Sequence, residues 1–172
     1  MDSFDRIEKR VILRAPISRV WQAIAGAKEF GRWFGINLDG EFVVGKPITG
    51  TFSAGFNEAA IHEYQRKLGL PPSKVKLPDK NLVFCTVERI EPEEYFSFRW
   101  IPYGIDADVD PESEPTTLVE FRLVKAVEGT LLTIVESGFD RVPAHRRERA
   151  FRMNEAGWTA QAESIRNNIG NP

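Results

Sequence analysis

The sequence predicts an α+β fold in which a curved antiparallel sheet packs against one long C-terminal helix. The helix is predicted from His145 to Ile169, a segment without proline that is followed by Gly170. Apolar side chains recur along it at the steps of three, four and seven that form one helical stripe: Phe151, Trp158, Ala162, Ile165 and Ile169. Before this helix, segments of alternating apolar and polar residues follow one another with short connections, which favours antiparallel pairing.

The N-terminal part is predicted to contain one strand and two short helices. The strand runs from Arg6 to Arg14, and Pro16 ends it and favours a helix start. The first helix ends at Gly26 and the second at Gly35. Apolar residues at helical spacing define them: Ile17, Val20, Trp21 and Ile24 in the first helix, and Phe30, Trp33 and Phe34 in the second. We expect the two helices to cover one end of the sheet.

The remaining strands are predicted from β-branched and aromatic residues with a period of two. Gly45-Lys46 and Glu128-Gly129 are expected to form hairpin turns. The predicted strands are Asn37–Val44, Pro47–Ala54, Leu82–Ile90, Tyr95–Ile101, Thr117–Lys125 and Thr130–Gly138.

Two segments interrupt this succession of strands. Asn57 to Asn81 forms an insertion in which Asn57 is expected to cap a short helix that ends at Gly69. Pro102 to Pro115 is an acidic loop, expected to be solvated, and loops of such length are often functional. We interpret residues 1–172 as a single domain with an insertion at about 57–81.

Composition excludes several classes of protein. A net charge of −2 argues against nucleic-acid binding, and no segment approaches the roughly 20 apolar residues of a membrane span. The single cysteine, Cys85, lies in an apolar strand and is expected to be a buried thiol in a reducing compartment. The N-terminus lacks the apolar core of a signal peptide. We therefore expect a cytoplasmic protein.

Metal and catalytic motifs are weak. Asp106, Asp108 and Asp110 have the spacing of the first three ligands of a calcium loop, but Pro111 replaces its glycine and Thr117 its glutamate. No nucleophile elbow, phosphate loop or dinucleotide motif occurs, and we expect no metal and no cofactor. A basic run opens the long helix and is interpreted as a solvated face, or alternatively as a docking patch for an acidic partner: Arg146, Arg147, Arg149 and Arg152.

Glu136 is the polar residue of greatest interest. It shares a strand face with Leu132 and Ile134, so it points into the interior if they face the long helix. A buried carboxyl has a raised pKa unless it is paired, and such groups are candidates for function. Equally, Glu136 could meet an arginine or a tryptophan N–H as a structural contact.

Aromatic residues supply the other part of a candidate site. Between sheet and helix we expect a partly apolar cleft with a few polar groups, the usual form of a small-molecule site. Gly157 indicates a close approach of the helix to a neighbouring element. The candidate ligand-binding residues are Trp100, Glu136, Asn154, Trp158, Phe98, Phe121 and Phe151.

Taken in order, short matches along nearly the whole chain resemble the START-like (SRPBCC) superfamily, in the branch named after the activator of heat-shock protein 90 ATPase. The insertion departs from the shorter turn of much of the family. The matching residues are Ala15-Pro16, Val20-Trp21, Trp33-Phe34, Gly45, Val87-Glu88, Ile90-Glu91-Pro92, Phe98-Arg99-Trp100, Gly129-Thr130, Glu136-Ser137-Gly138-Phe139 and Gly157-Trp158.

The resemblance implies a helix-grip (START-like, Bet v-like) fold with a cavity between sheet and helix, and members bind lipids, sterols, polyketides or other apolar molecules. We rank first the binding of a small hydrophobic or aromatic ligand in that cavity. The second hypothesis is a chaperone-associated stress-response module whose partner contacts the basic helix start and the acidic loop. The third is a cyclase or isomerase that uses Glu136 as acid or base. No catalytic residue transfers from the family, and an enzyme is less expected than a binding protein.

Overall fold

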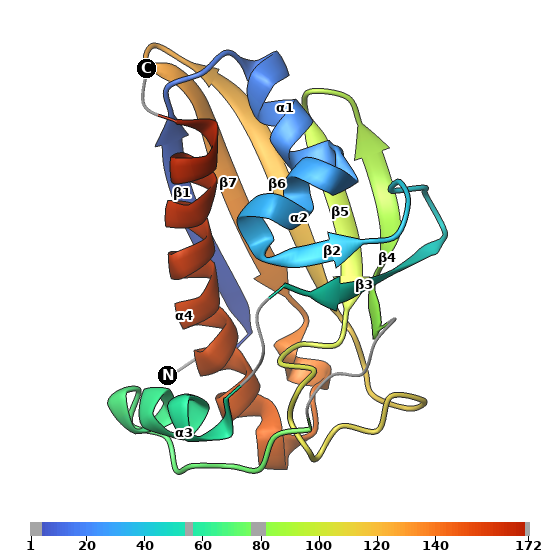
Figure 1. Ribbon diagram of the computed structural model, residues 1–172, viewed down its shortest axis with the longest axis vertical. Helices are drawn as coiled ribbons and strands as arrows, with labels where there is room; N and C mark the ends of the chain where they lie inside the picture. The colour runs from blue at the N-terminus through green and yellow to red at the C-terminus, as the bar shows by residue number, and fades with distance from the viewer. Residues whose placement is uncertain (1–4, 54–56, 77–81, 171–172) are drawn as a thin grey trace.

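Seven antiparallel strands form one sheet in the order β1-β7-β6-β5-β4-β3-β2 (Figure 1). The computed structural model describes residues 5–53, 57–76 and 82–170. The strands are β1 (Arg6–Leu13), β2 (Ile36–Leu38), β3 (Pro47–Phe52), β4 (Leu82–Glu91), β5 (Tyr95–Trp100), β6 (Thr117–Ala126) and β7 (Gly129–Ser137).

Helices α1, α2 and α4 cover one face of this sheet (Figure 1). The C-terminal helix begins one residue before the predicted start and runs along β1. No helix in the described ranges is long and apolar enough to cross a membrane. The predicted α+β class with a long C-terminal helix is confirmed. The helices are α1 (Ile17–Ala25), α2 (Ala27–Phe34), α3 (Glu58–Lys67) and α4 (Ala144–Ile169), with a 3₁₀ turn, η1 (Phe139–Arg141).

Aromatic rings fill most of the space between the sheet and the helices. Phe30 of α2 is fully buried, and its ring centroid lies 6.2 Å from that of Phe98 and 6.1 Å from that of Phe121. The strict alternation of β5 and β6 places both strand residues on the covered face. Edge-to-face pairs of this kind stabilise by about 0.5–1.5 kcal/mol each beyond the burial of their area. This part of the interior is therefore packed core.

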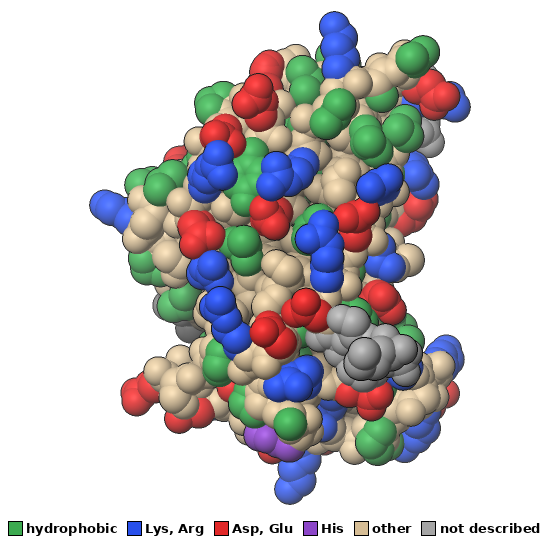
Figure 2. All heavy atoms as spheres, turned by 180° about the vertical axis from the view of Figure 1, so that it is seen from behind, with side chains coloured by type: hydrophobic (Ala, Val, Ile, Leu, Met, Phe, Trp, Pro, Cys, Tyr) green, Lys and Arg blue, Asp and Glu red, His purple; other side chains and the backbone are tan. Residues whose placement is uncertain are grey.

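The opposite face of the sheet carries charged side chains of both signs with apolar side chains between them (Figure 2). Arg99 of β5 pairs with Glu88 of β4 at 2.9 Å, and Arg122 pairs with Glu120 on β6 at 3.2 Å. An antiparallel sheet with one solvated face shows this arrangement.

The predicted strand from Asn37 to Val44 is wrong beyond Leu38. At Gly40 the backbone has φ 99°, and Phe42 then turns inward, where its ring lies 4.8 Å from that of Phe96. Residues 43–46 join β4 instead, because the Gly45 N–H donates to the Val87 carbonyl. The connection from β2 to β3 is thus longer than the predicted two-residue turn. The end predicted for the next strand, Ala54, lies outside the described residues.

The insertion contains α3, whose predicted cap is confirmed. The Asn57 side chain accepts a hydrogen bond from the Ala60 N–H at 3.2 Å. Further on, Gln65 is fully buried and donates to the hydroxyl of Tyr103, and Val75 pairs with Asp106 in an isolated bridge. The insertion therefore packs on the acidic loop; its last residues, 77–81, are outside the described ranges.

The acidic loop in turn is bound to the start of α4, which corrects the prediction that both are solvated. The side chain of Arg146 is completely buried, contacting Glu114 at 2.6 Å and Asp106 at 3.4 Å. Arg149, one turn along, pairs with Asp106 at 2.8 Å and Asp108 at 2.9 Å. Residues three apart share a helix face, so both guanidinium groups reach the same loop. Of the three carboxylates that resembled calcium ligands, Asp106 and Asp108 pair with arginine, and Asp110 accepts hydrogen bonds from Ser113 and the Glu112 N–H.

Candidate functional site

Glu136 of β7 is fully buried on the covered face of the sheet. Its Oε2 accepts hydrogen bonds from Trp100 Nε1 at 2.7 Å and Thr117 Oγ1 at 2.6 Å. Its Oε1 accepts one from Trp158 Nε1 at 2.8 Å. The Asn154 amide donates to both oxygens, at 3.0 and 3.1 Å. One carboxylate thus collects donors from β5, β6 and α4.

Strand register and helix spacing bring these groups together. Glu136 lies opposite Val119 in β6 and Ile7 in β1, both at most 1% exposed, so apolar neighbours flank it across the sheet. Trp100 pairs with Thr117, one step further along the same face. On α4, Asn154 and Trp158 are four residues apart and therefore share the face that covers the sheet.

The site contains a buried carboxyl group among neutral donors. Burial raises the pKa of Glu136 above its ordinary range, and the four hydrogen-bond donors oppose this shift. An indole N–H can only donate, so Trp100 and Trp158 both require an accepting oxygen. The set of donors is complementary to the ionised carboxylate. The sequence suggested an arginine or a tryptophan N–H as a structural partner of Glu136. Two tryptophan N–H groups donate to it, and no arginine of the described residues does.

A pocket of about 130 Å³ opens beside this carboxylate, between the end of α2, the end of β5 and the middle of α4. Three aromatic rings line it, with centroids 5.6 to 6.1 Å apart. An engineered apolar cavity of roughly 150 Å³ holds one benzene molecule, so the volume suits a single ring or a group of similar bulk. The lining residues are Phe34, Trp100, Met153, Asn154, Gly157, Trp158 and Gln161.

Gly157 is the feature of α4 that leaves this pocket open. A Cβ added at this position would meet no other side chain or element within 4 Å. The close approach predicted from the sequence is therefore wrong: open space adjoins the glycine. Glycine in a helix interior costs about 1 kcal/mol relative to alanine, and here no packing contact explains that cost.

The remaining predicted residues lie elsewhere. Phe98 and Phe121 are fully buried among other rings, and Phe151 packs against Phe139 with centroids 5.2 Å apart. None of the three lines the pocket. Of the seven candidates, the structure brings together Glu136, Trp100, Asn154 and Trp158.

Sequence reasoning missed other members of the site. Met153 and Gln161 are four residues on either side of Gly157, so helical spacing could have identified them. Phe34 ends the second predicted helix, and no local signal placed it against α4. Thr117 reaches Glu136 because its strand pairs with β7, where Val119, on the same face of β6 as Thr117, lies opposite Glu136.

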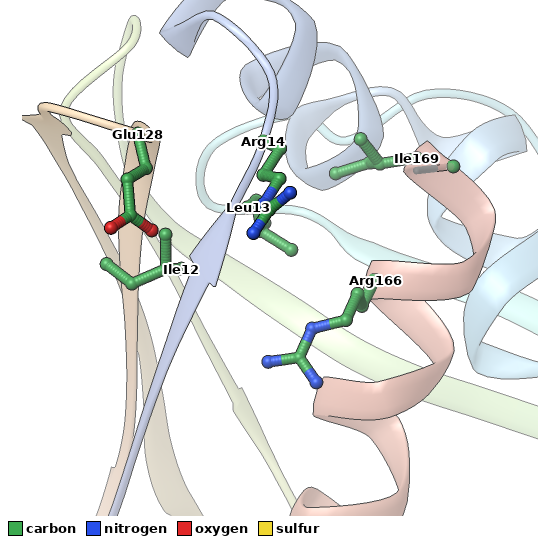
Figure 3. A pocket seen from close by; sticks show the side chains of 7 residues that line it. Ile12, Leu13, Arg14, Glu128, Arg166 and Ile169 are labelled. Atoms are coloured by element: carbon green, nitrogen blue, oxygen red, sulfur yellow. The ribbon is translucent and has the colours of Figure 1, made fainter. Parts of the chain in front are cut away.

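A larger hollow of about 520 Å³ lies between the end of β1 and the end of α4, with the Arg14 and Arg166 side chains at its sides (Figure 3). Arg166 pairs with Glu163 at 2.9 Å. The described residues that line this hollow form no buried polar cluster, and the hollow borders Gly170, the last described residue. We therefore place the candidate site at the smaller pocket, beside Glu136.

Comparison with known proteins supports the fold. Residues 74–170 match the family described as Activator of Hsp90 ATPase homolog 1-like protein. No curated protein matches the chain significantly.

Solved structures resemble the chain over nearly its whole length. Protein MLL2253 from Mesorhizobium loti superposes with a TM-score of 0.63 at 20% identity, covering 95% of this chain and 96% of its own. The Aha1 dimer from Colwellia psychrerythraea has a TM-score of 0.60 at 17% identity, covering 95% of each chain. DynU16, described as a putative protein in the dynemicin biosynthetic locus, superposes with a TM-score of 0.60 at 21% identity, covering 94% of this chain and 46% of its own. At such identities the likeness is one of fold.

Proposed function

The chain belongs to the Activator of Hsp90 ATPase homolog 1-like protein family, and we propose that it binds one small apolar or aromatic molecule in the pocket between α2, β5 and α4. Trp100, Trp158 and Asn154 line this pocket. Glu136 supports it from below by holding both indoles and the amide in place. The bound group is the size of one aromatic ring, because the pocket is too small for a sterol or a long acyl chain.

Gly157 is the observation that carries this proposal. A helix packed on a sheet gains stability when side chains fill its inner face, since empty space costs dispersion energy. Gly157 lies in the interior of α4 and faces open space, so it lowers helix propensity and makes no packing contact in return. Retention of a cavity explains that double cost.

Ring stacking supplies the expected binding energy. The ligand contacts Trp100, Trp158 and Phe34, and offset or edge-to-face aromatic contacts each contribute about 0.5–1.5 kcal/mol beyond area burial. Asn154 and Gln161 at the rim offer amide oxygens, because their amide nitrogens donate to Glu136 and to the Phe34 carbonyl. A single ring with one hydrogen-bonding substituent fits this arrangement.

Titration with benzyl alcohol, followed by tryptophan fluorescence, tests the proposal. The wild type should show saturable binding, and Gly157→Leu should abolish it, because the new side chain fills the pocket. Ala160→Leu is the matched control, since it adds the same side chain on the exposed side of α4 and should bind as the wild type does. The proposal fails if the wild type shows no saturation, or if Gly157→Leu binds equally well.

An enzyme that uses Glu136 as acid or base is a second candidate, favoured by the burial that raises the pKa of this carboxyl. Both carboxylate oxygens are engaged by donors, and Glu136 does not line the pocket. It could therefore exchange a proton with a ligand only after one of its donors moved aside. Glu136→Gln should then remove turnover of a candidate substrate while benzyl alcohol still binds.

A chaperone-associated role draws support from the family's description. The surface first expected to serve it is occupied within the chain, because Arg146 and Arg149 pair with the acidic loop. We therefore rank this role below ligand binding.

A further inference from the structure

We propose that the pocket beside Glu136 selects small organic cations, such as a quaternary ammonium group, over neutral molecules of the same shape. This inference rests on the proposed function and names the chemical class of its ligand. It follows from three properties of the site: an uncompensated charge, polarised aromatic rings and a neutral lining.

The Glu136 carboxylate, in its ionised form, has no positive partner among the described residues in its hydrogen-bonding shell. Its four donors are two indoles, a hydroxyl and an amide, all of them neutral. Away from water, a charge acts over a longer distance than it does at the surface, because the effective dielectric constant is lower. A cation in the adjacent pocket would therefore be attracted by it.

The residues between Glu136 and the pocket transmit this charge. Trp100 and Trp158 direct their N–H groups at the carboxylate while the same side chains line the pocket. Hydrogen bonding to a charged acceptor polarises the donor, which enriches the indole ring in negative charge. Aromatic faces attract cations placed within about 6 Å of the ring centroid, and tryptophan does so most strongly.

The rim of the pocket favours the same ligand. Asn154 donates through Nδ2 to Glu136, and its Oδ1 makes no hydrogen bond to a described residue. Every lining residue is uncharged, so no arginine or lysine of the lining competes for the site. The volume of about 130 Å³ accommodates a trimethylammonium group. A carboxylate ligand would meet repulsion from Glu136.

Choline and 3,3-dimethylbutan-1-ol provide the test, because they share a shape and differ in charge. Calorimetric titration of the wild type should give a dissociation constant at least about tenfold lower for choline, a difference of about 1.4 kcal/mol. Gly157→Leu should abolish binding of choline, and Ala160→Leu should not. Glu136→Gln, checked for folding by circular dichroism, should reduce the preference to within about twofold.

Each outcome has one meaning. The inference is overturned if the alcohol binds as tightly as choline, if Gly157→Leu still binds choline, or if folded Glu136→Gln keeps the tenfold preference. If Glu136→Gln does not fold, the wild-type comparison and Gly157→Leu still decide. Saturable binding of benzyl alcohol without preference for choline over the alcohol of the same shape refutes only the preference for cations. If none of the three compounds binds, the proposed function is refuted as well.

Discussion

Replacement of Gly157 by alanine should stabilise the protein while weakening its binding of ligand. In a helix interior, the helix propensity of alanine is more favourable than that of glycine by about 0.8–1.0 kcal/mol. The added methyl group has no neighbour within 4 Å, so no steric cost offsets this gain. In a domain of 150–250 residues, about 1 kcal/mol raises Tm by roughly 2–4 °C. The same methyl group enters the pocket, so the affinity for benzyl alcohol should fall.

Gly31→Ala is the matched control, because Gly31 also lies inside a helix but its added Cβ would come 2.1 Å from the Ile36 carbonyl oxygen. Thermal unfolding followed by circular dichroism should show a higher Tm for Gly157→Ala and a lower one for Gly31→Ala. A lower Tm for Gly157→Ala would refute the reasoning, since it would mean that the space beside Gly157 is filled. An unchanged affinity for benzyl alcohol would show that the ligand binds elsewhere.

Three further predictions concern buried polar groups. Burial raises the pKa of Glu136 above 4.5, so the folded state keeps its proton to higher pH than the unfolded state, and the stability contributed by this group is lost as pH rises through the raised pKa. In denaturant titrations, the free energy of unfolding of the wild type minus that of Glu136→Gln should therefore fall over this pH window. A rise of this difference would contradict the prediction. Arg146→Met should lower the free energy of unfolding by about 3–5 kcal/mol, because it leaves Asp106 buried without this partner. Arg10→Ala, at an exposed ion pair, should lower it by less than about 1 kcal/mol. Similar losses in the two variants would contradict the distinction between buried and exposed pairs. Burial raises the pKa of Cys85 to about 12, so a disulfide reagent at pH 8 should label it only after unfolding; rapid labelling of the native protein would contradict this.

Local patterns were sufficient for much of the site. The alternation of β7 placed Glu136 on the face of Leu132 and Ile134, and the structure has all three at 0% exposure. Helical spacing placed Asn154 and Trp158 together on α4. Both arguments use only the geometry of one element, which is why they succeeded.

Contacts between distant segments were beyond such patterns. Phe42 leaves the predicted strand because its ring is buried against Phe30 and Phe96, which belong to other elements. Arg146 looked solvated because its partner Asp106 is 40 residues away in the chain. A run of arginines has the same local pattern whether water or a buried carboxylate faces it.

The sequence by itself determined the α+β class, the long C-terminal helix and the inward direction of Glu136, because period and spacing specify which side chains share a face. The tertiary structure decided what those faces enclose. Most of the expected cleft is packed by aromatic rings, and the remaining pocket exists where Gly157 of α4 passes the indoles of Trp100 and Trp158. Whether a glycine adjoins a neighbour or empty space depends on how closely two elements pack, and the distance between two elements is not encoded in the sequence pattern of either one.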